Sequence, residues 1–204
     1  MHDDGSGAHD PHEWGLTGII LADEGDAVEA AGEESLQRLE FRDIVALVVP
    51  VADSAAELEC SEILAHRRAL ERVMRDQAVL PARPGIVFSS RSTVMTFLEE
   101  RYLSIKEAFD AVSGRWEFRL EMNADDDILD DVGPAIYREL RQRAHLSMPF
   151  RRSDPHVYSA GFLIERAATG LFRSRVAELA AENREITLEL TGPLPPYDFV
   201  TIQA

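Results

Sequence analysis

Three stretches in the first half of the chain have the composition of β-strands. Residues 14–22 and 41–51 are rich in β-branched and apolar side chains. The second stretch is apolar almost throughout, as expected of a strand that is buried on both faces. A shorter strand is expected at residues 85–88, after Pro81 and Pro84 interrupt the chain.

Between these strands the apolar residues recur every three to four positions, which predicts two helices. The first is expected over residues 55–77 and the second over residues 92–112, ended by Ser113 and Gly114. The expected apolar stripe of the first helix is Ile63, His66, Leu70 and Val73, and arginines 67, 68, 72 and 75 lie mostly outside it. The expected apolar stripe of the second helix is Val94, Leu98, Ile105, Phe109 and Val112. On the apolar side of the first helix, His66 is expected to be a hydrogen-bonded structural residue rather than a catalytic one.

A new set of elements follows Gly114. Residues 116–122 alternate apolar and charged side chains, which predicts a strand with Glu and Arg on a solvated face. An acidic turn and a helix are expected next, with Pro134 in its first turn. The inner face of this helix is expected to be Ile136, Leu140 and Ala144, and a connecting loop is expected over 147–156.

Strands are expected over 158–164 and 186–190, with a helix between them over 169–182. The expected core stripe of that helix is Leu171, Phe172, Val176 and Leu179.

These patterns predict an α+β protein made of two small domains. The break at Ser113 and Gly114 places the domains at residues 14–113 and 114–204, after a mobile acidic tail of residues 1–13. In the second domain the order is strand, helix, strand, helix, strand, and a last strand after the prolines is left open. This order is close to a ferredoxin-like sandwich, so a modified form of that fold is expected.

The charge of the chain argues against two kinds of partner. The 204 residues carry a formal net charge of −16, which opposes binding to nucleic acid or to anionic membrane surfaces. Most of the excess lies in residues 1–62, which hold sixteen acidic residues and two arginines, and the acidic residues 23–34 are expected to form a loop. No apolar run approaches the roughly 18–20 residues that cross a bilayer, and the acidic start differs from a signal peptide. The single Cys60 excludes an internal disulfide, so a cytoplasmic location is expected.

The sequence also lacks the common motifs of catalysis and of cofactor binding. It contains no GxGxxG or GxxxxGK[ST] phosphate-binding pattern, no HExxH and no GxSxG. Asp125 to Asp131 is rich in carboxylates, but the sixth position is Asp130 and the twelfth is Ile136, where an EF-hand has glycine and glutamate. Weak metal capture by His2, His9 and His12 of the tail is conceivable, but a solvated terminus is favoured. We therefore expect a protein that is not an enzyme and that needs no cofactor or metal.

Several segments together resemble the gas vesicle protein L/F family (GvpL/GvpF). They are FRDIVALVVPV (41–51), AHRRALERVMRDQAVLPARPGIVFSS (65–90), GRWEFRLEMN (114–123), YSAGFLIER (158–166) and the ending TGPLPPYDFV (191–200). The resemblance covers roughly residues 41–201 in consistent order, and the Gly-Pro-x-Pro-Pro-Tyr-x-Phe ending is its most specific part.

This resemblance implies an accessory protein of the gas vesicle, a minor structural or assembly component. The implied partners are the small hydrophobic shell protein and other gas vesicle accessory proteins, and the implied location is the gas vesicle and the cytoplasm. The candidate structural or interaction positions are His66, Pro81, Arg83, Gly85, Gly192, Pro193, Pro195, Pro196, Tyr197 and Phe199.

Two other classes of function stay open at this point. An enzyme or small-ligand-binding module on a ferredoxin-like scaffold would use His66, Arg83 and Tyr197 in one cleft. An RNA-binding sheet would need exposed aromatic side chains, for which Trp116 and Phe118 are available, although the net charge argues against it.

The proline-rich ending is expected to be a rigid clasp. Proline fixes φ near −65° and removes a backbone donor, so residues 192–199 are expected to form an extended turn and not a regular strand or helix. Tyr197 and Phe199 would then point to the same side and seal the edge of the sheet against the first domain. The alternative is that this pair is an exposed docking site for the shell protein.

Overall fold

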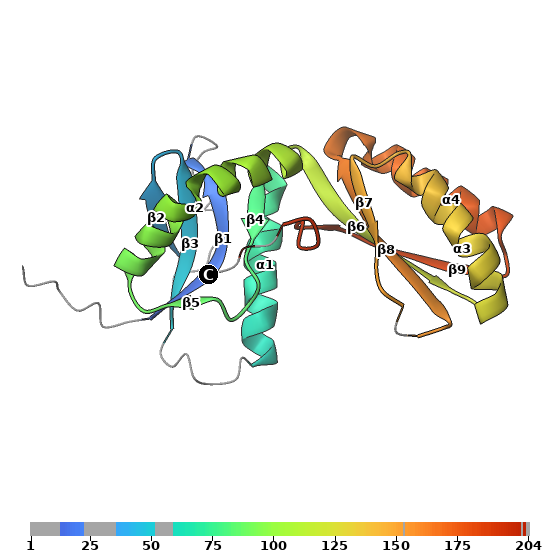
Figure 1. Cartoon of the computed structure of the whole chain (residues 1–204), viewed down its shortest axis with the longest axis horizontal. Coiled ribbons are helices and arrows are strands. Elements are labelled where there is room, and N and C mark those ends of the chain that lie inside the picture. The colour runs from blue at the N-terminus through green and yellow to red at the C-terminus, as the bar shows by residue number, and fades with distance from the viewer. Residues whose placement is uncertain (1–12, 23–35, 52–58, 153, 201, 203–204) are drawn as a thin grey trace, which may run out of the picture. The chain divides into compact units, whose positions relative to one another are not determined.

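The computed structural model describes residues 13–22, 36–51, 59–152, 154–200 and 202 (Figure 1). The chain divides into two compact units, Met1–Asp110 with Thr201–Ala204, and Ala111–Val200. The expected tail before Glu13, with His2, His9 and His12, and the expected loop 23–34 lie outside the described residues.

The first unit is built on an antiparallel sheet with the order β2-β3-β1-β4, in which β5 also pairs with β1. Its strands are β1 (Glu13–Leu21), β2 (Gln37–Phe41), β3 (Ile44–Val51), β4 (Val79–Pro81) and β5 (Val87–Phe88). The strands expected at 14–22 and 85–88 are confirmed as β1 and β5. The strand expected over 41–51 is confirmed over residues 44–51 as β3. Its start is corrected, because Phe41 ends β2 and the chain turns at Arg42 and Asp43 to form the β2–β3 hairpin.

Contacts from the second helix hold this hairpin turn in place. Arg42 has φ 55°, a left-handed conformation that is costly for a residue with a side chain. Its guanidinium lies over the Tyr102 ring at 4.8 Å, while Asp43 accepts hydrogen bonds from Tyr102 Oη at 2.6 Å and Lys106 Nζ at 2.8 Å. The hydrogen bonds from Lys106 and then from Tyr102 lower the pKa of Asp43. The strained turn is thus fixed by charge and by aromatic contact.

Two helices complete the first unit, α1 (Cys60–Asp76) and α2 (Arg91–Val112). The expected stripe of α2 is buried throughout, and Ser90 and Thr93 cap its start with reciprocal hydrogen bonds of 3.1 and 3.2 Å. In α1 the contact with β1 and β4 begins late in the helix. Its buried residues are Ala69, Leu70, Val73 and Met74, whereas Ile63, expected in the stripe, is exposed.

The second unit has the ferredoxin-like order of elements. Its strands are β6 (Arg115–Asn123), β7 (Leu146–Pro149), β8 (Val157–Glu165) and β9 (Thr187–Leu194), and its helices are α3 (Asp126–Arg141) and α4 (Thr169–Glu182), with a short 3₁₀ turn η3 (Arg166–Ala168) before α4. The antiparallel sheet has the order β7-β8-β6-β9, so the two central strands are the first and third of the unit. The loop expected over 147–156 is corrected, because its first residues form the edge strand β7.

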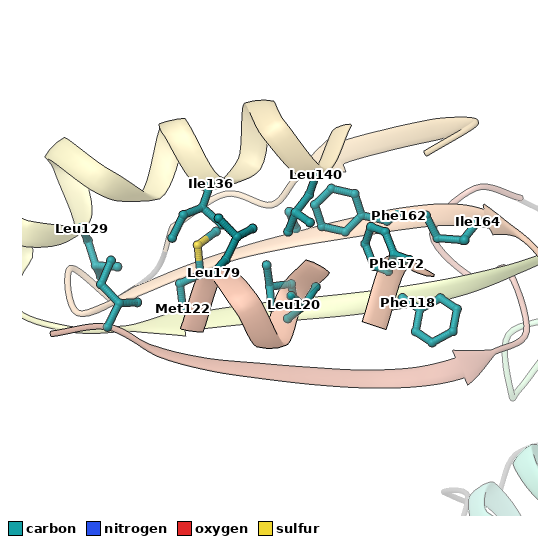
Figure 2. Packing of buried hydrophobic residues seen from close by; sticks show 13 residues of the cluster. Phe118, Leu120, Met122, Leu129, Ile136, Leu140, Phe162, Ile164, Phe172 and Leu179 are labelled. Atoms are coloured by element: carbon teal, nitrogen blue, oxygen red, sulfur yellow. The ribbon is translucent and has the colours of Figure 1, made fainter. Parts of the chain in front are cut away.

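One face of this sheet and the two helices enclose a continuous apolar core (Figure 2). Its aromatic centre is Phe172 of α4, whose ring lies 5.9 Å from that of Phe118 and 5.4 Å from that of Phe162, on the central strands. The fully or nearly fully buried side chains of this core include Phe118, Leu120, Met122, Leu129, Ile136, Leu140, Phe162, Ile164, Phe172, Val176 and Leu179. Leu171, expected in the core stripe, is 78% exposed, because the helical rotation that turns Phe172 inward carries its neighbour away from the sheet.

The start of α3 also differs from the expectation. The helix begins at Asp126 in the acidic run, where carboxylates favour a helix N-terminus, so Pro134 lies in the helix interior and not in its first turn. Arg152 pairs with Asp126 at 2.7 Å and with Asp130. Ala144 lies beyond the last helical residue, and Leu129 joins Ile136 and Leu140 on the inner face.

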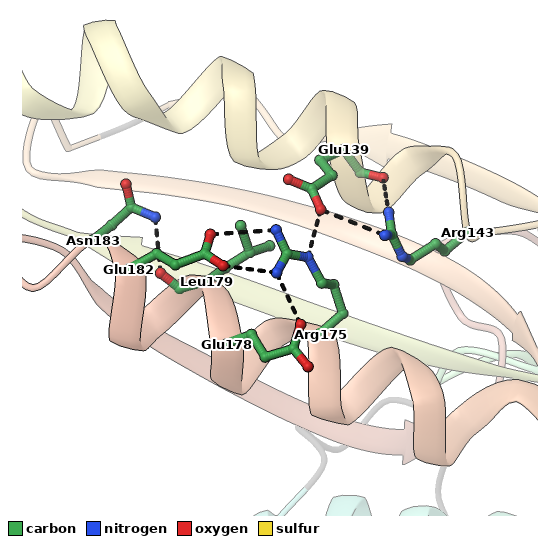
Figure 3. Close-up of polar contacts among 7 residues, drawn as sticks. All are labelled: Glu139, Arg143, Arg175, Glu178, Leu179, Glu182 and Asn183. Carbon is green, nitrogen blue, oxygen red and sulfur yellow. Dashed lines mark hydrogen bonds and ion pairs between the residues drawn. The ribbon is translucent and has the colours of Figure 1, made fainter.

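An ion-pair network joins the two helices on their outer side (Figure 3). The Arg175 guanidinium on α4 pairs with Glu139 of α3 and, at 2.9 Å each, with Glu178 and Glu182 of its own helix. The hydrogen bond from Arg175 lowers the pKa of Glu139. This arginine is therefore engaged within the fold.

A pair of glycine substitutions tests the packing of β9. A Cβ at Gly192, where φ is 139°, would lie 2.6 Å from Phe118 Cδ1 and 2.9 Å from the Glu117 carbonyl oxygen. Gly192→Ala is expected to destabilise the protein by about 2 kcal/mol or more, because both backbone and ring must move. The control Gly170→Ala in α4, where a Cβ meets nothing within 4 Å, is expected to be neutral or to stabilise by about 0.5 kcal/mol. Urea unfolding measures both, and equal effects would contradict the packing described here.

Candidate functional site

The face of the second sheet opposite the helices carries a buried acidic side chain, that of Glu117. Along β6, Phe118 points to the helices, so Glu117 and Arg119 belong to the other face. The alternation predicts that these charged residues are solvated, but Glu117 is 0% exposed. The expectation fails for Glu117 because another part of the chain covers this face.

The cover is the end of the proline-rich segment. Gly161 of β8 pairs with Arg119, and a Cβ at Gly161 would lie 3.6 Å from both Asp198 Oδ2 and Phe199 Cε2. It would also lie 3.1 Å from Phe150 Cζ, just after β7. A small residue at this position lets the segment lie directly on the sheet.

Glu117, Arg119 and Asp198 form one hydrogen-bonded cluster. Arg119 Nε donates to Glu117 Oε1 at 3.0 Å and to Asp198 Oδ2 at 2.7 Å, and Arg119 Nη2 donates to Asp198 Oδ1 at 2.8 Å. The backbone N–H of Asp198 donates to Glu117 Oε2 at 2.9 Å. The cluster thus ties the C-terminal segment to the middle of the sheet through side chain and backbone alike.

Two carboxyl groups share a single arginine in this cluster, and this determines how Glu117 titrates. Burial, and then the hydrogen bond between its carboxyl group and that of Asp198, raise the pKa of Glu117 to about 8. With Glu117 protonated, one arginine balances one carboxylate and the buried group carries no net charge. The arrangement can bind a proton near neutral pH.

The proline-rich segment departs from its predicted form in its first half. Gly192, Pro193 and Leu194 belong to β9, where Leu194 pairs with Glu117, so the expectation that no part of the segment is a strand is wrong. Because β9 lies at the edge of the sheet, the missing N–H of Pro193 is tolerated there.

The second half of the segment is a turn. Tyr197 N–H donates to the Pro195 carbonyl at 2.7 Å, and Val200 N–H donates to the Pro196 carbonyl at 3.1 Å. Pro195 and Pro196 are buried, while Tyr197 and Phe199 are half-buried. The chain is therefore not extended at the two aromatic residues, and whether they serve in structure or in docking stays a prediction.

An apolar row lies on the same sheet face at the β7 edge. Leu146 pairs with the buried Leu163 and Met148 pairs with Gly161, so both side chains point away from the helices. Leu146 is 43% exposed and Met148 is 38% exposed. We call Leu146, Met148, Phe150, Tyr197 and Phe199 the open-face apolar surface.

The candidate positions of the first unit surround the turn after β4. His66 Nε2 bonds to the carbonyl oxygen of Ala82 at 2.9 Å, which fits the expected structural histidine. Pro81 is buried opposite Gly18, Arg83 is exposed, and Gly85 has φ 93° in the turn that follows.

The two rival functions meet different outcomes. The cleft hypothesis combines His66 and Arg83 of one unit with Tyr197 of the other and stays a prediction. The RNA-binding hypothesis required exposed aromatic side chains on which bases can stack. Phe118 cannot serve in this way, because it is fully buried against the helices.

The described part of the chain carries neither a metal-binding cluster nor a membrane-spanning helix. Within it, no group of three or more His, Cys, Asp or Glu side chains is arranged to hold a metal ion. None of the helices among these residues combines the length and the apolar character needed to cross a bilayer.

Sequence reasoning missed Glu117, Arg119 and Asp198 as a group. The available indication was the acidic residue inside an aromatic, proline-rich ending, together with a Glu-x-Arg pair on a central strand. Only the return of the chain over the sheet brings residues 117 and 198 together.

The fold and the covered face define a two-unit α+β protein with a ferredoxin-like second unit, and comparisons with known proteins agree. A crystal structure of the gas vesicle protein GvpF from an Anabaena species superposes with a TM-score of 0.83 at 18% identity, covering 95% of this chain and 98% of that one. GvpF from Microcystis aeruginosa superposes with a TM-score of 0.79 at 15% identity, covering 94% and 100%. These likenesses establish the shared fold.

Sequence comparison gives the family. The model of the gas vesicle synthesis protein GvpL/GvpF family matches residues 16–148 and 130–201, and gas vesicle protein F1 of Halobacterium salinarum is 24% identical over 186 residues, 87% of this chain and 86% of that protein. The chain belongs to the GvpL/GvpF family of gas vesicle synthesis proteins. This membership assigns it an accessory role in gas vesicles.

The buried cluster gives a prediction about pH. An acid whose pKa is raised on folding stabilises the fold at low pH, and this contribution is lost as pH rises through the folded value, here between about 4.5 and about 8. Glu117→Gln, which mimics the protonated form, is expected to match the native protein in stability at pH about 5 and to exceed it at pH about 9. Urea unfolding at both pH values measures this.

The control for this experiment is Glu121→Gln, at an exposed position four residues further along β6 on the same strand face. This variant is expected to follow the pH dependence of the native protein. A Glu117→Gln variant that is equally less stable at both pH values would show that Glu117 is ionised in the fold.

Proposed function

We propose that this protein is a minor structural or assembly component that contacts the small hydrophobic shell protein during gas vesicle formation. It acts by binding and catalyses no reaction, and other gas vesicle accessory proteins are further partners. Nucleic acids and membranes are not among its partners. Its place of action is the gas vesicle and the cytoplasm in which the vesicle is assembled.

The open-face apolar surface is the observation that supports this proposal most directly. Leu146 and Met148 are exposed at a sheet edge, and the half-buried Tyr197 and Phe199 come from the segment lying on the same sheet face. Apolar side chains gathered on one face of a protein are typical of an interaction surface. A hydrophobic shell subunit needs a partner that covers its apolar surface before assembly.

We assign the two roles to different members of this surface. Phe199 lies against Gly161 beside the Arg119–Asp198 ion pair, so the aromatic pair belongs to the clasp and supports the fold. Leu146 and Met148 lie at the edge and are free to contact a partner. We further propose two domains, 14–113 and 114–204. In the first domain, the turn after β4 is held by the other candidate positions, His66, Pro81, Arg83 and Gly85.

Two double variants separate these roles. Tyr197→Ala with Phe199→Ala is expected to lower the free energy of unfolding by several kcal/mol, about 3 or more, because packing against the sheet is lost. Leu146→Ser with Met148→Ser is expected to keep its melting temperature and to lose co-purification with the co-expressed shell protein. The measurements are thermal unfolding and affinity co-purification.

Leu171→Ser is the matched control, since among the residues that the structure describes Leu171 is the most exposed large apolar one, and it lies on α4, which covers the opposite face of the sheet. It is expected to keep both stability and shell binding. If the Leu146 and Met148 variant still co-purifies with the shell protein, the proposed contact surface is wrong. If the Tyr197 and Phe199 variant stays fully stable but loses the shell protein, the aromatic pair is the docking site.

A further inference from the structure

The first half of α1 carries a surface that the proposed function does not use. Every residue from Cys60 to Arg68 is exposed except His66, which is half-buried, and the first buried residue of the helix is Ala69. Ile63 is 42% exposed and Leu64 is 44% exposed. Leu64 lies on the outward side of the helix, where its aliphatic side chain stays in contact with water unless a partner covers it, whereas Ile63 lies on the stripe that leads to the buried Leu70.

The same helix face is basic in an otherwise acidic protein. Leu64, Arg68 and Arg75 are spaced four and seven residues apart, so they fall on one stripe of the helix, and Arg72 lies beside it. Within the part of the chain that the structure describes, neither Arg68 nor Arg75 has a carboxylate within ion-pair distance. Arg67 pairs with Glu71 at 3.1 Å. We call Leu64, Arg68, Arg72 and Arg75 the α1 basic face.

Charge and apolar content together select the partner. At physiological ionic strength charges are screened beyond about 8 Å, so a partner at the α1 basic face experiences mainly the charges of α1 itself. The one carboxylate on this stripe, Glu71, already pairs with Arg67, so the arginines outnumber it there. A nucleic acid would contact a larger region of the protein and be repelled by its net charge of −16, and it would make no favourable contact with the exposed Leu64. A short acidic peptide with an aliphatic residue complements both features.

We propose that the α1 basic face is a docking site for an acidic, leucine-containing peptide segment of a partner protein. Carboxylates of the segment pair with Arg68 and Arg75, and its aliphatic side chain covers Leu64. The site belongs to the first unit, whereas the open-face apolar surface belongs to the second unit. It serves partner selection by charge, in addition to the apolar contact proposed above.

A peptide titration tests this site with the full-length protein. The probe is a fluorescent synthetic peptide of repeated Glu-Glu-Leu-Ala units, and its control is the same peptide with Gln in place of Glu. Fluorescence anisotropy is expected to show saturable binding of the acidic probe alone, weakening as salt rises from about 0.05 M to about 0.5 M. Arg68→Glu with Arg75→Glu is expected to weaken binding at least about ten-fold, and Leu64→Ser several-fold.

The matched control is Arg138→Glu with Arg141→Glu at exposed positions of α3, which changes the net charge by the same amount. It is expected to leave binding unchanged, and circular dichroism checks that every variant is folded. No binding of the acidic probe to the native protein, or equal loss in both double variants, would overturn the proposal. Tighter binding of a single-stranded RNA oligonucleotide, lost in the α1 variant, would overturn it in favour of nucleic acid. Because no shell protein is present, these outcomes do not bear on the shell contact.

Discussion

The arrangement on the helix-free face of the second sheet depends on one buried carboxyl group. Glu117 lies on a central strand with no exposed surface, a position that is costly for an acid unless its hydrogen bonds are satisfied. Arg119 and the backbone N–H of Asp198 satisfy them. The partners are far apart in sequence, so the requirement to satisfy one carboxyl group determines where the last residues of the chain lie. Packing of Phe199 and Phe150 around Gly161 follows from that placement.

Periodicity predicted those elements whose residues mainly contact a single core. The strands β1, β6 and β8 and the helices α2 and α4 correspond to their patterns, and the ferredoxin-like order followed from them. The β2–β3 hairpin was missed because its tight turn at Arg42 contains no glycine and is held by residues of α2, which no local pattern reveals. The short edge strand β7 was missed because its side chains are largely exposed and Pro149 ends it.

The candidate site shows the limit of the same reasoning. The residues of the proline-rich ending alone indicated Tyr197 and Phe199 as candidate structural or docking positions. For Glu117, alternation along β6 indicates only which face of the sheet the side chain lies on. It does not indicate what covers that face. Glu117 was therefore expected in water, and its burial follows from a contact that closes over eighty residues of chain. Residues that act through such long-range contacts need a structure to be found.

The single lysine of the chain has a practical consequence for chemical probing. Lys106 lies on α2 and its ammonium pairs with Asp43 at the β2–β3 turn. Among the side chains, an amine-directed reagent such as a succinimidyl ester can therefore attach only at Lys106, apart from its reaction with the α-amino group. Acylation of Lys106 removes its positive charge, so the label itself releases one of the two groups that hold the strained turn. A crosslink formed there would map contacts of α2 in a locally loosened first unit.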